Sequence, residues 1–405
     1  MRRESRKAFA PLAEREFRLL FAGRTISIVG NSFASVALAF AVLDVTGSKA
    51  DLGYVLAARS VPQVLFLLAG GVWADRLPRH HVMVASNLAS GASQAALAAL
   101  LLTGSAGIGE LLALAAINGT SSAFFFPAST GIIPQTVPTP MLQSANALLR
   151  LGLNGSFIGG AALGGLVVAA SSPGWAIAVD AATFVLAAAL VGAMRLPASL
   201  RLEGSRFLAE LHEGWREFRS RTWLWAIVLQ FSVVNAAVSG SVYVLGPVVA
   251  KSHLGGAAPW GGVLAAESIG LVLGGLAMLR LRPRRMLLAA TLGIFLMPLL
   301  PLSLAFPLPL AAIIGFALVG GMGIETFSVL WDTTIQQEIP GEKLSRVSSY
   351  DALGSFVLIP LGLSAAGAVA ATIGTRATFF ATVGIIVGAT ALVLLVRDVR
   401  TLERR

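Results

Sequence analysis

Four ionisable side chains lie deep within long apolar runs of the sequence, where a charge is costly and needs a reason: Glu267, Glu325, Asp180 and Arg59. A charged side chain near the centre of a membrane-spanning helix costs about 2.5–3.5 kcal/mol on insertion scales. Surroundings of low polarity favour the protonated form of a carboxylic acid, so a buried acid can bind and release a proton near neutral pH. The two glutamates are therefore candidate proton carriers, and Asp180 is the next candidate.

A structural interpretation of the same residues stays open. Arg59 and Asp180 lie at similar depths in their runs, so each could be the partner that makes the other tolerable. Glu267 and Glu325 could instead be structural acids held by Ser, Thr or backbone groups. Other polar side chains within apolar runs are candidates to line a cavity: Asn31, Gln63, Asn118, Asn154, Gln230 and Asn235.

Other kinds of chemistry find no support in the residue types. The chain has no Cys and only four His, so it offers no disulfide, no thiol nucleophile and no thiolate metal site. No HExxH spacing, catalytic constellation or phosphate-binding G-x-x-x-x-G-K-[ST] motif occurs. We therefore expect neither an enzyme nor an ATP-driven pump, and we expect no metal and no cofactor.

The apolar runs that hold these residues dominate the composition. Of the 405 residues 56% are hydrophobic and only 12% are charged, which is about half the charged share of a soluble domain. The runs are continuous rather than alternating, and each is long enough to cross a bilayer core of about 30 Å as a helix. Twelve spans are predicted, at 19–43, 52–74, 82–103, 109–131, 144–170, 174–194, 223–250, 259–279, 286–306, 308–331, 347–372 and 376–396.

The basic residues predict the orientation of these spans. With twelve spans both termini lie on one side, and 24 of the 30 Lys and Arg residues fall on that side. Only Lys49, Lys251 and Arg376 fall on the other side. Because cytoplasmic loops carry the excess of Lys and Arg, both termini are predicted to be cytoplasmic. The same loops explain the net charge of +10 without a nucleic-acid partner.

The chain also repeats itself at about half its length. IPQTVPTPMLQSAN at 133–146 resembles IQQEIPGEKLSRVS at 335–348, and the basic turn within 70–86 resembles that within 274–290. Such repeats indicate two bundles with a substrate site near the midplane between them. We expect an all-α membrane protein with two six-helix bundles related by a pseudo-two-fold axis. The bundles would be 1–194 and 223–405, joined by a cytoplasmic linker at 195–222 with an amphipathic helix.

The turn between spans 2 and 3 carries the most specific motif. It reads GVWADRLPRHHVM from residue 71 and resembles the signature loop G-x-L-A-D-R-x-G-R-R/K-x-x-L of the major facilitator superfamily. Pro78 replaces the usual Gly, Trp73 replaces Leu, and His80 stands where Arg or Lys is usual. The positions that match are Gly71, Ala74, Asp75, Arg76 and Arg79. The resemblance implies that Asp75 locks one conformational state, and that Arg76 and Arg79 make conformation-dependent ion pairs.

Two further resemblances refine the expectation. In span 5, Gly160, Gly164 and Gly165 lie in a stretch that resembles the G-P-x-x-G-G element of antiporters, with Ala161 in place of Pro. The stretches 17–31, 123–138 and 174–190 resemble the drug-efflux branch that contains macrolide exporters and the enterobactin exporter. That branch often has Gly-Asp in the middle of span 1, where this chain has Asn31 after a glycine.

The predicted function is therefore secondary transport by alternating access in the cell membrane. We expect proton-driven export of a hydrophobic or amphipathic small molecule, such as a drug or a natural product, by a monomer whose partners are the lipid bilayer, its substrate and protons. Uptake of a nutrient or metabolite, and movement of a lysolipid, stay open as alternatives. A membrane sensor that does not transport is the alternative from another class.

Overall fold

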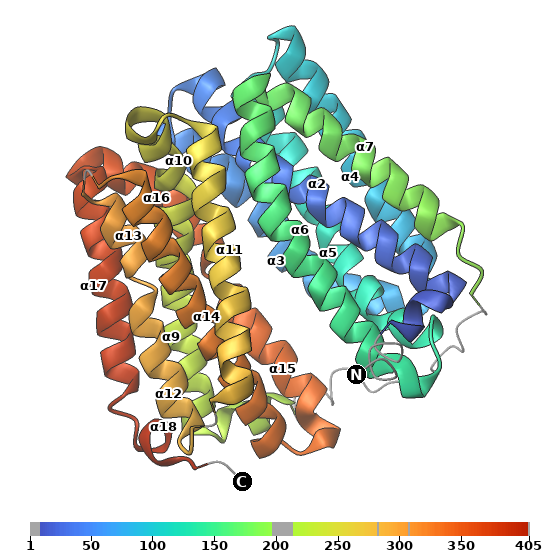
Figure 1. The fold of residues 1–405 in the computed structure, drawn as a ribbon, viewed down its shortest axis with the longest axis vertical. Helices are drawn as coiled ribbons and strands as arrows, with labels where there is room; N and C mark the ends of the chain where they lie inside the picture. Colours follow the sequence, from blue (N-terminus) through green and yellow to red (C-terminus); the bar gives the residue numbers. More distant parts are fainter. Residues whose placement is uncertain (1–8, 197–213, 282, 307, 404–405) are drawn as a thin grey trace. The chain divides into compact units, whose positions relative to one another are not determined.

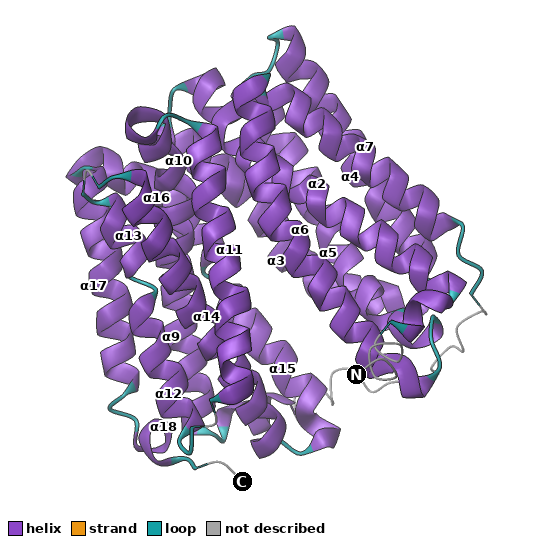
Figure 2. Ribbon diagram, viewed as in Figure 1, coloured by secondary structure: helices purple, strands orange, loops and turns teal. Residues whose placement is uncertain are grey.

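The computed structural model describes residues 9–196, 214–281, 283–306 and 308–403. The side chains of 67–76, 143, 279, 341–342 and 345–346 lie outside this description. Within the described residues all regular structure is helical, as Figure 2 shows. This follows from the apolar runs, since a backbone in lipid must satisfy its own hydrogen bonds and a helix does so within one segment.

By its internal contacts the chain divides into two compact units. The first unit comprises residues 1–47 and 58–203, and the second comprises 48–57 and 204–405. The helices of the first unit are labelled in Figure 1: α2 (Arg15–Thr46), α3 (Lys49–Arg76), α4 (Arg79–Thr103), α5 (Ile108–Gly131), α6 (Leu142–Ala170) and α7 (Pro173–Gly192). The first nine residues of α3 belong to the second unit, because the division falls after Ala57.

The first unit is built around α2 and α4, which both pack against α7. α2 also packs against α6, and α4 against α5. α2 ends at Gly47, whose φ of 65° lets the chain leave the helix in the left-handed conformation that glycine adopts without strain. A buried apolar cluster that includes Phe17, Leu20 and Met83 joins the ends of these helices.

After the first nine residues of α3, the described part of the second unit continues with a helical segment at 214–219. Its main helices are α9 (Thr222–Val238), α10 (Gly246–Val249), α11 (Ala257–Arg280), α12 (Met286–Gly293), α13 (Leu299–Leu304), α14 (Leu310–Glu338), α15 (Gly341–Phe356), α16 (Ile359–Ile373), α17 (Thr375–Val393) and α18 (Arg397–Thr401). α11 packs along α14, while α9 packs against α15, α16 and α17. Two π-helical stretches, Ser239–Leu245 and Ala250–Leu254, continue the helix that starts as α9.

Eleven helical stretches among the described residues are long and apolar enough to cross a membrane. They coincide with eleven of the twelve predicted spans, and four of them are made of consecutive shorter helices: Thr139–Ala170, Thr222–Leu254, Met286–Leu304 and Val347–Ile373. The remaining predicted span, 52–74, falls on α3, a helix of 28 residues. The predicted linker at 195–222 lies largely outside the described residues, apart from its two ends.

Candidate functional site

A fully buried carboxylate lies inside the first unit. Asp180 of α7 is 0% exposed, and its Oδ2 atom accepts a hydrogen bond of 2.6 Å from Gln94 Nε2 of α4. Within the described part of the chain, its Oδ1 atom has no partner in good hydrogen-bond geometry, although the Thr183 hydroxyl lies close enough to act on the carboxyl group. A buried polar atom without a partner carries a free-energy cost of about 1–3 kcal/mol, more if it is charged. A proton on Asp180 would lower that cost, because a carboxylic acid is easier to bury than a carboxylate.

Helix α2 leaves room for this carboxylate through a glycine. A Cβ atom at Gly30 would lie 2.6 Å from Asp180 Oδ1, so any side chain there would collide with the acid. The next residue, Asn31, accepts a hydrogen bond of 2.9 Å from Arg59 Nη2 of α3. The Arg59 cation also acts on Asp180 electrostatically. Arg59, Asn31, Asp180 and Gln94 thus form a polar network that joins α2, α3, α4 and α7.

Arg59 and Asp180 do not hydrogen-bond to each other, and each bonds instead to a neutral amide. The pairing considered from the sequence is therefore electrostatic, without direct contact between the two groups. Gln94 gave no sequence signal beyond being an amide in an apolar run, and its role follows only from the packing of α4 on α7. The network has one positive and one negative charge, so protonation of Asp180 would change its net charge.

The other polar residues singled out in the first unit have separate places. Asn118 of α5 is 3% exposed, and neither its Oδ1 nor its Nδ2 atom has a hydrogen-bond partner among the described residues. The next residue, Gly119, lets α5 approach the backbone carbonyl of Arg59. Gln63 is exposed and Asn154 is half-buried. Asn118 is therefore the one that lies buried beside the helix that carries Arg59.

The two glutamates that are candidate proton carriers belong to the second unit and lie on the two helices that pack most extensively there, α11 and α14. Glu267 is half-buried on α11, and its backbone carbonyl faces Gly321 of α14 at close range. Glu325 is half-buried on α14, and its Oε1 atom would lie 3.6 Å from a Cβ at Gly275. At 1.5 Å per residue, Gly275 lies about 12 Å along α11 from Glu267. The glutamates thus occupy successive levels of one helix interface.

Glu267 has an aromatic hydroxyl in its electrostatic environment. Its carboxylate acts on the Tyr243 phenol, which belongs to the π-helical stretch Ser239–Leu245. The polar residues Gln230 and Asn235 instead fasten α9 to its neighbours. Gln230 Nε2 donates to Thr390 Oγ1 at 3.0 Å, and Asn235 Nδ2 donates to the Ser355 carbonyl at 3.0 Å. The bond of Asn235 accounts for its amide nitrogen, whereas the buried Gln230 Oε1 atom has no hydrogen-bond partner among the described residues.

The signature turn is described only in part. The side chains of Asp75 and Arg76, and the surroundings of Gly71, lie outside the described residues. Arg79, at the start of α4, donates from Nη1 to the carbonyl of Gly131 at the end of α5. Arg24 Nη1 of α2 donates to the Ser129 carbonyl of α5 at 3.2 Å. Two arginines thus satisfy carbonyl groups at the negative end of the α5 dipole.

The glycines of span 5 divide into two groups on α6. A Cβ at Gly160 would lie 2.5 Å from Ser32 Cβ, and one at Gly164 would lie 2.7 Å from Phe33 Cα of α2. A Cβ at Gly155 or Gly159 would meet no atom within 4 Å. Gly165 is buried. Gly160 and Gly164 therefore permit the close packing of α6 on α2, next to the residues Gly30 and Asn31.

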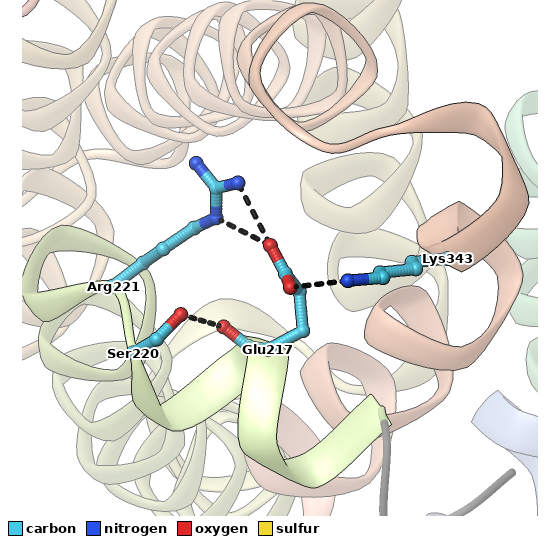
Figure 3. Close-up of polar contacts among 4 residues, drawn as sticks. All are labelled: Glu217, Ser220, Arg221 and Lys343. Carbon is cyan, nitrogen blue, oxygen red and sulfur yellow. Dashed lines mark hydrogen bonds and ion pairs between the residues drawn. The ribbon is translucent and has the colours of Figure 1, made fainter.

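The described end of the linker is fastened to α15. Glu217 accepts hydrogen bonds from Arg221 Nη2 at 2.8 Å and from Lys343 Nζ at 3.0 Å, as Figure 3 shows. Arg221 and then Lys343 hold the pKa of Glu217 below its usual value of about 4.5. Trp215 stacks on Phe218 at 5.7 Å between ring centroids, and both rings contact Tyr350 of α15. This end of the linker is thus part of the second unit.

Ionisable and amide groups held between packed membrane helices are often found on substrate or ion pathways. The fold is shared with solved structures. The nucleoside transporter NupG superposes with a TM-score of 0.75 at 13% identity, over 94% of this chain and 98% of that one. A bacterial homologue of the lysosomal transporter Spinster superposes with a TM-score of 0.73 at 15% identity, over 96% of this chain and 98% of the other.

The sequence places the chain within this class. The model of the transmembrane secretion effector family matches residues 6–404, so the chain belongs to that family of the major facilitator superfamily. It is 29% identical to the multidrug efflux pump Tap of Mycolicibacterium fortuitum over 90% of this chain and 91% of that protein. It is 22% identical to macrolide efflux protein A of Streptococcus pyogenes over 96% and 97%. The enterobactin exporter EntS of Salmonella typhi is 27% identical over 85% of both chains. The resemblance to this efflux branch is confirmed.

Proposed function

We propose that this protein exports a hydrophobic or amphipathic small molecule, such as a drug or a natural product, by proton-coupled alternating access. The observation that carries the proposal is the whole-length similarity to three proteins named as efflux pump, efflux protein and exporter. Acidic side chains held between helices of both units support the coupling to protons, because a carboxyl group can load and release a proton as its surroundings change.

We propose a monomer in the cell membrane that has twelve spans and both termini in the cytoplasm. α3 would be the second span, alongside the eleven apolar helical stretches. The proposed bundles are residues 1–194 and 223–405, joined by the linker at 195–222. The signature residues Gly71, Asp75, Arg76 and Arg79 would act at the cytoplasmic side as a conformational lock. Gly160, Gly164 and Gly165 would serve the packing of span 5.

Three acids are proposed as proton carriers: Glu267, Glu325 and Asp180. Asp180 is the most buried of them, and Arg59 keeps a positive charge in its environment. Protonation of Asp180 would leave Arg59 without its counter-charge and would change the forces among α2, α3, α4 and α7. Glu267 and Glu325 lie at one helix interface, so a proton on either would change how α11 sits on α14.

The energy of one proton is sufficient for useful export. Moving one charge through 100 mV is worth about 2.3 kcal/mol. Each 1.4 kcal/mol corresponds to a tenfold concentration ratio, so one proton can support a gradient of well over tenfold. If a monovalent cation leaves for each proton that enters, no net charge moves and the pH difference alone drives transport.

The test is transport into inside-out vesicles that contain the protein, driven by an imposed pH difference. Erythromycin serves as an amphipathic drug, uridine as a nucleoside and lysophosphatidylcholine as a lysolipid. We expect uphill accumulation of the drug, abolished by an uncoupler. Drug accumulation that persists in the presence of the uncoupler would overturn proton coupling. Accumulation of uridine inside right-side-out vesicles would overturn export.

Uptake is the second candidate function, and the fold shared with a nucleoside transporter is the observation in its favour. A lysolipid transporter would instead move the lysolipid probe and not the drug. A sensor would bind a ligand without moving any of the three probes in either orientation of the vesicle. The same experiment therefore separates all four functions.

A further inference from the structure

The two oxygen atoms of the Asp180 carboxyl group have different surroundings. Oδ2 accepts the hydrogen bond of 2.6 Å from Gln94 Nε2 of α4. Oδ1 lies toward α2, beside Thr183 of its own helix. A Cβ atom at Gly30 of α2 would lie 2.6 Å from Asp180 Oδ1 and would overlap Thr183 Oγ1. The carboxyl oxygen and the hydroxyl oxygen therefore border the same small space that the glycine leaves open.

The hydrogen atom of the Thr183 hydroxyl group is already used. Thr183 Oγ1 donates to the backbone carbonyl of Asp180, one turn earlier in α7, at 2.7 Å. A hydroxyl group has one hydrogen to donate and two lone pairs that can accept. Toward Asp180 Oδ1, Thr183 therefore offers an acceptor and no donor. Among the described residues, no group donates to Oδ1 in good geometry.

These surroundings fit a carboxylic acid better than a carboxylate. A carboxylate only accepts hydrogen bonds, so its Oδ1 atom would face the lone pairs of Thr183 Oγ1 without a hydrogen between them. A carboxylic acid with its proton on Oδ1 would donate to Thr183 Oγ1 and would keep the bond from Gln94 at Oδ2. Because Asp180 is 0% exposed, an unmade bond at this atom carries the full cost of burial.

The charge on Arg59 acts in the opposite sense. Arg59 of α3 acts electrostatically on Asp180, and a nearby cation favours the carboxylate. The helices packed most closely on α7 are α2, α4 and α6, whose ionisable residues are Arg15, Glu16, Arg18, Arg24, Asp44, Arg79, His80, His81 and Arg150. Arg24 comes nearest to the level of Asp180, about 9 Å along α2 from Gly30. Arg59 thus favours the charged form of Asp180, while Thr183 fits the neutral form.

From the Oδ1 atom without a donor, the hydroxyl hydrogen already in use and the space at Gly30, we infer that Thr183 holds the proton that Asp180 takes up. The proton binds to Oδ1, the new O–H group donates to Thr183 Oγ1, and the carboxyl group passes from one negative charge to none. Gln94 bonds to Oδ2 in both states and keeps the carboxyl group oriented. This inference rests on the proposed role of Asp180 as a proton carrier, and it adds the atom that binds the proton and the residue that positions it.

The two neighbours of the carboxyl group should therefore act in opposite senses. Thr183 bonds only to the neutral form, so its hydroxyl group strengthens proton binding. Gln94 is a donor, and a donor bonds more strongly to a carboxylate than to a neutral acid, so Gln94 weakens proton binding. A substitution that merely loosened the packing of α7 would give no reason for opposite signs. The sign of each effect thus separates a positioning role from a structural one.

The test is a pH titration of the purified full-length protein in detergent, followed by infrared difference spectroscopy of the C=O band of protonated carboxyl groups. Asp180 is assigned by the part of the band that is missing in Asp180→Asn. Thr183→Val keeps the shape of the side chain and removes the hydroxyl group. We expect this variant to bind the proton about three- to tenfold more weakly and to titrate at lower pH. Thr183→Ser should titrate as the parent protein does, and Gln94→Leu should titrate at higher pH.

Thr382→Val is the matched control. Thr382 is a buried threonine of α17 in the second unit, and its hydroxyl group likewise bonds one turn back, to the carbonyl of Thr378. Its replacement should leave the titration of Asp180 unchanged. Melting temperatures check the folding of every variant, and Thr183→Ala takes the place of Thr183→Val if the latter does not fold.

Two results would overturn the inference. The Asp180 band of Thr183→Val could titrate as it does in the parent protein, or it could move to higher pH, which would mean that Thr183 serves the carboxylate as a donor. A different result would overturn the proposed role of Asp180 as a proton carrier, and the inference with it: a parent protein in which Asp180→Asn removes no part of the band at any pH. The titration therefore distinguishes failure of the inference alone from failure of the proposed role.

Discussion

Arg59 is a half-buried cation whose hydrogen-bond partner is a neutral residue. It donates to Asn31, which is uncharged, so Asp180 provides the nearest identified negative charge in its environment. An acid at position 31 would form a direct ion pair with Arg59, and Asp180 would no longer be needed as its counter-charge. The amide at this position therefore makes the charge state of Asp180 matter to the whole network.

We expect Arg59→Met to destabilise the protein by about 1–3 kcal/mol, because Asp180 would lose its nearby positive charge and would have to be buried uncompensated or take up a proton. The double variant Arg59→Met, Asp180→Asn should regain most of this loss. The measurement is the denaturant or thermal midpoint of the detergent-solubilised protein. Asn31→Ala is the control, since it removes an acceptor of Arg59 and leaves both Arg59 and Asp180 in place; an equal loss in this variant would contradict the explanation.

The proposed proton carriers are distinguished by proton release. We expect substrate addition to the purified protein to release protons, and we expect Glu267→Gln or Glu325→Gln to abolish that release while still permitting exchange of substrate down its gradient. The readout is a pH indicator in weakly buffered solution. If both variants release as many protons as the parent protein, the same measurement on Asp180→Asn becomes decisive. Unchanged release in all three would remove these acids from the coupling.

At the scale of elements, the glycines of α6 differ in what surrounds them. Gly160→Ala and Gly164→Ala should each destabilise the protein by about 1–3 kcal/mol, since α6 would be pushed from Ser32 and Phe33 of α2. Gly155→Ala and Gly159→Ala are matched controls on the same helix and should be neutral or stabilising by up to about 1 kcal/mol, because alanine favours a helix. Melting temperatures decide the matter. Equal effects at all four positions would contradict the packing argument.

The ion pairs of Glu217 fasten the linker segment to α15, and acid should loosen them. The folded-state pKa of Glu217 lies below its usual value, so its stabilisation is fully present above about pH 4.5. It is lost as the pH falls through the folded-state pKa. We expect Glu217→Gln to cost about 1 kcal/mol at neutral pH and nothing in strong acid, read from melting temperatures across pH. A cost that does not change with pH would contradict this account.

At the scale of the whole molecule, the absence of cysteine makes the topology directly testable. Single cysteines at Ser105 and Ser171 should react with an impermeant maleimide added to intact cells. Cysteines at Ser220 and Glu403 should react only after the membrane is opened. Labelling of the Ser220→Cys variant from outside the cell would contradict the twelve-span orientation.

The sequence was sufficient to predict most of the helices and the family. Long apolar runs have few alternatives in a membrane, so α2, α11 and α14 coincide with predicted spans. The contacts of Asp180 were beyond prediction, because Gln94 is distant in the chain and becomes its partner only through the packing of α4 on α7. The place of Thr183 beside the Oδ1 atom was missed for a related reason. A threonine within an apolar run gives no signal of its own, and its surroundings depend on how α2 meets α7 at Gly30.

The two π-helical stretches have a consequence for comparing this chain with its relatives. A π-helical turn holds one residue more than the α-helical turn it replaces, and often arises by insertion of a single residue. Aligned without a gap to a relative whose corresponding span is wholly α-helical, the residues beyond Ser239–Leu245 would be shifted by one position, or about 100° around the helix axis. Residue roles transferred through such an alignment would fall on the wrong face of the helix. At 22–29% identity, residues of this span have to be matched to those of relatives by superposing backbones rather than by aligning sequences.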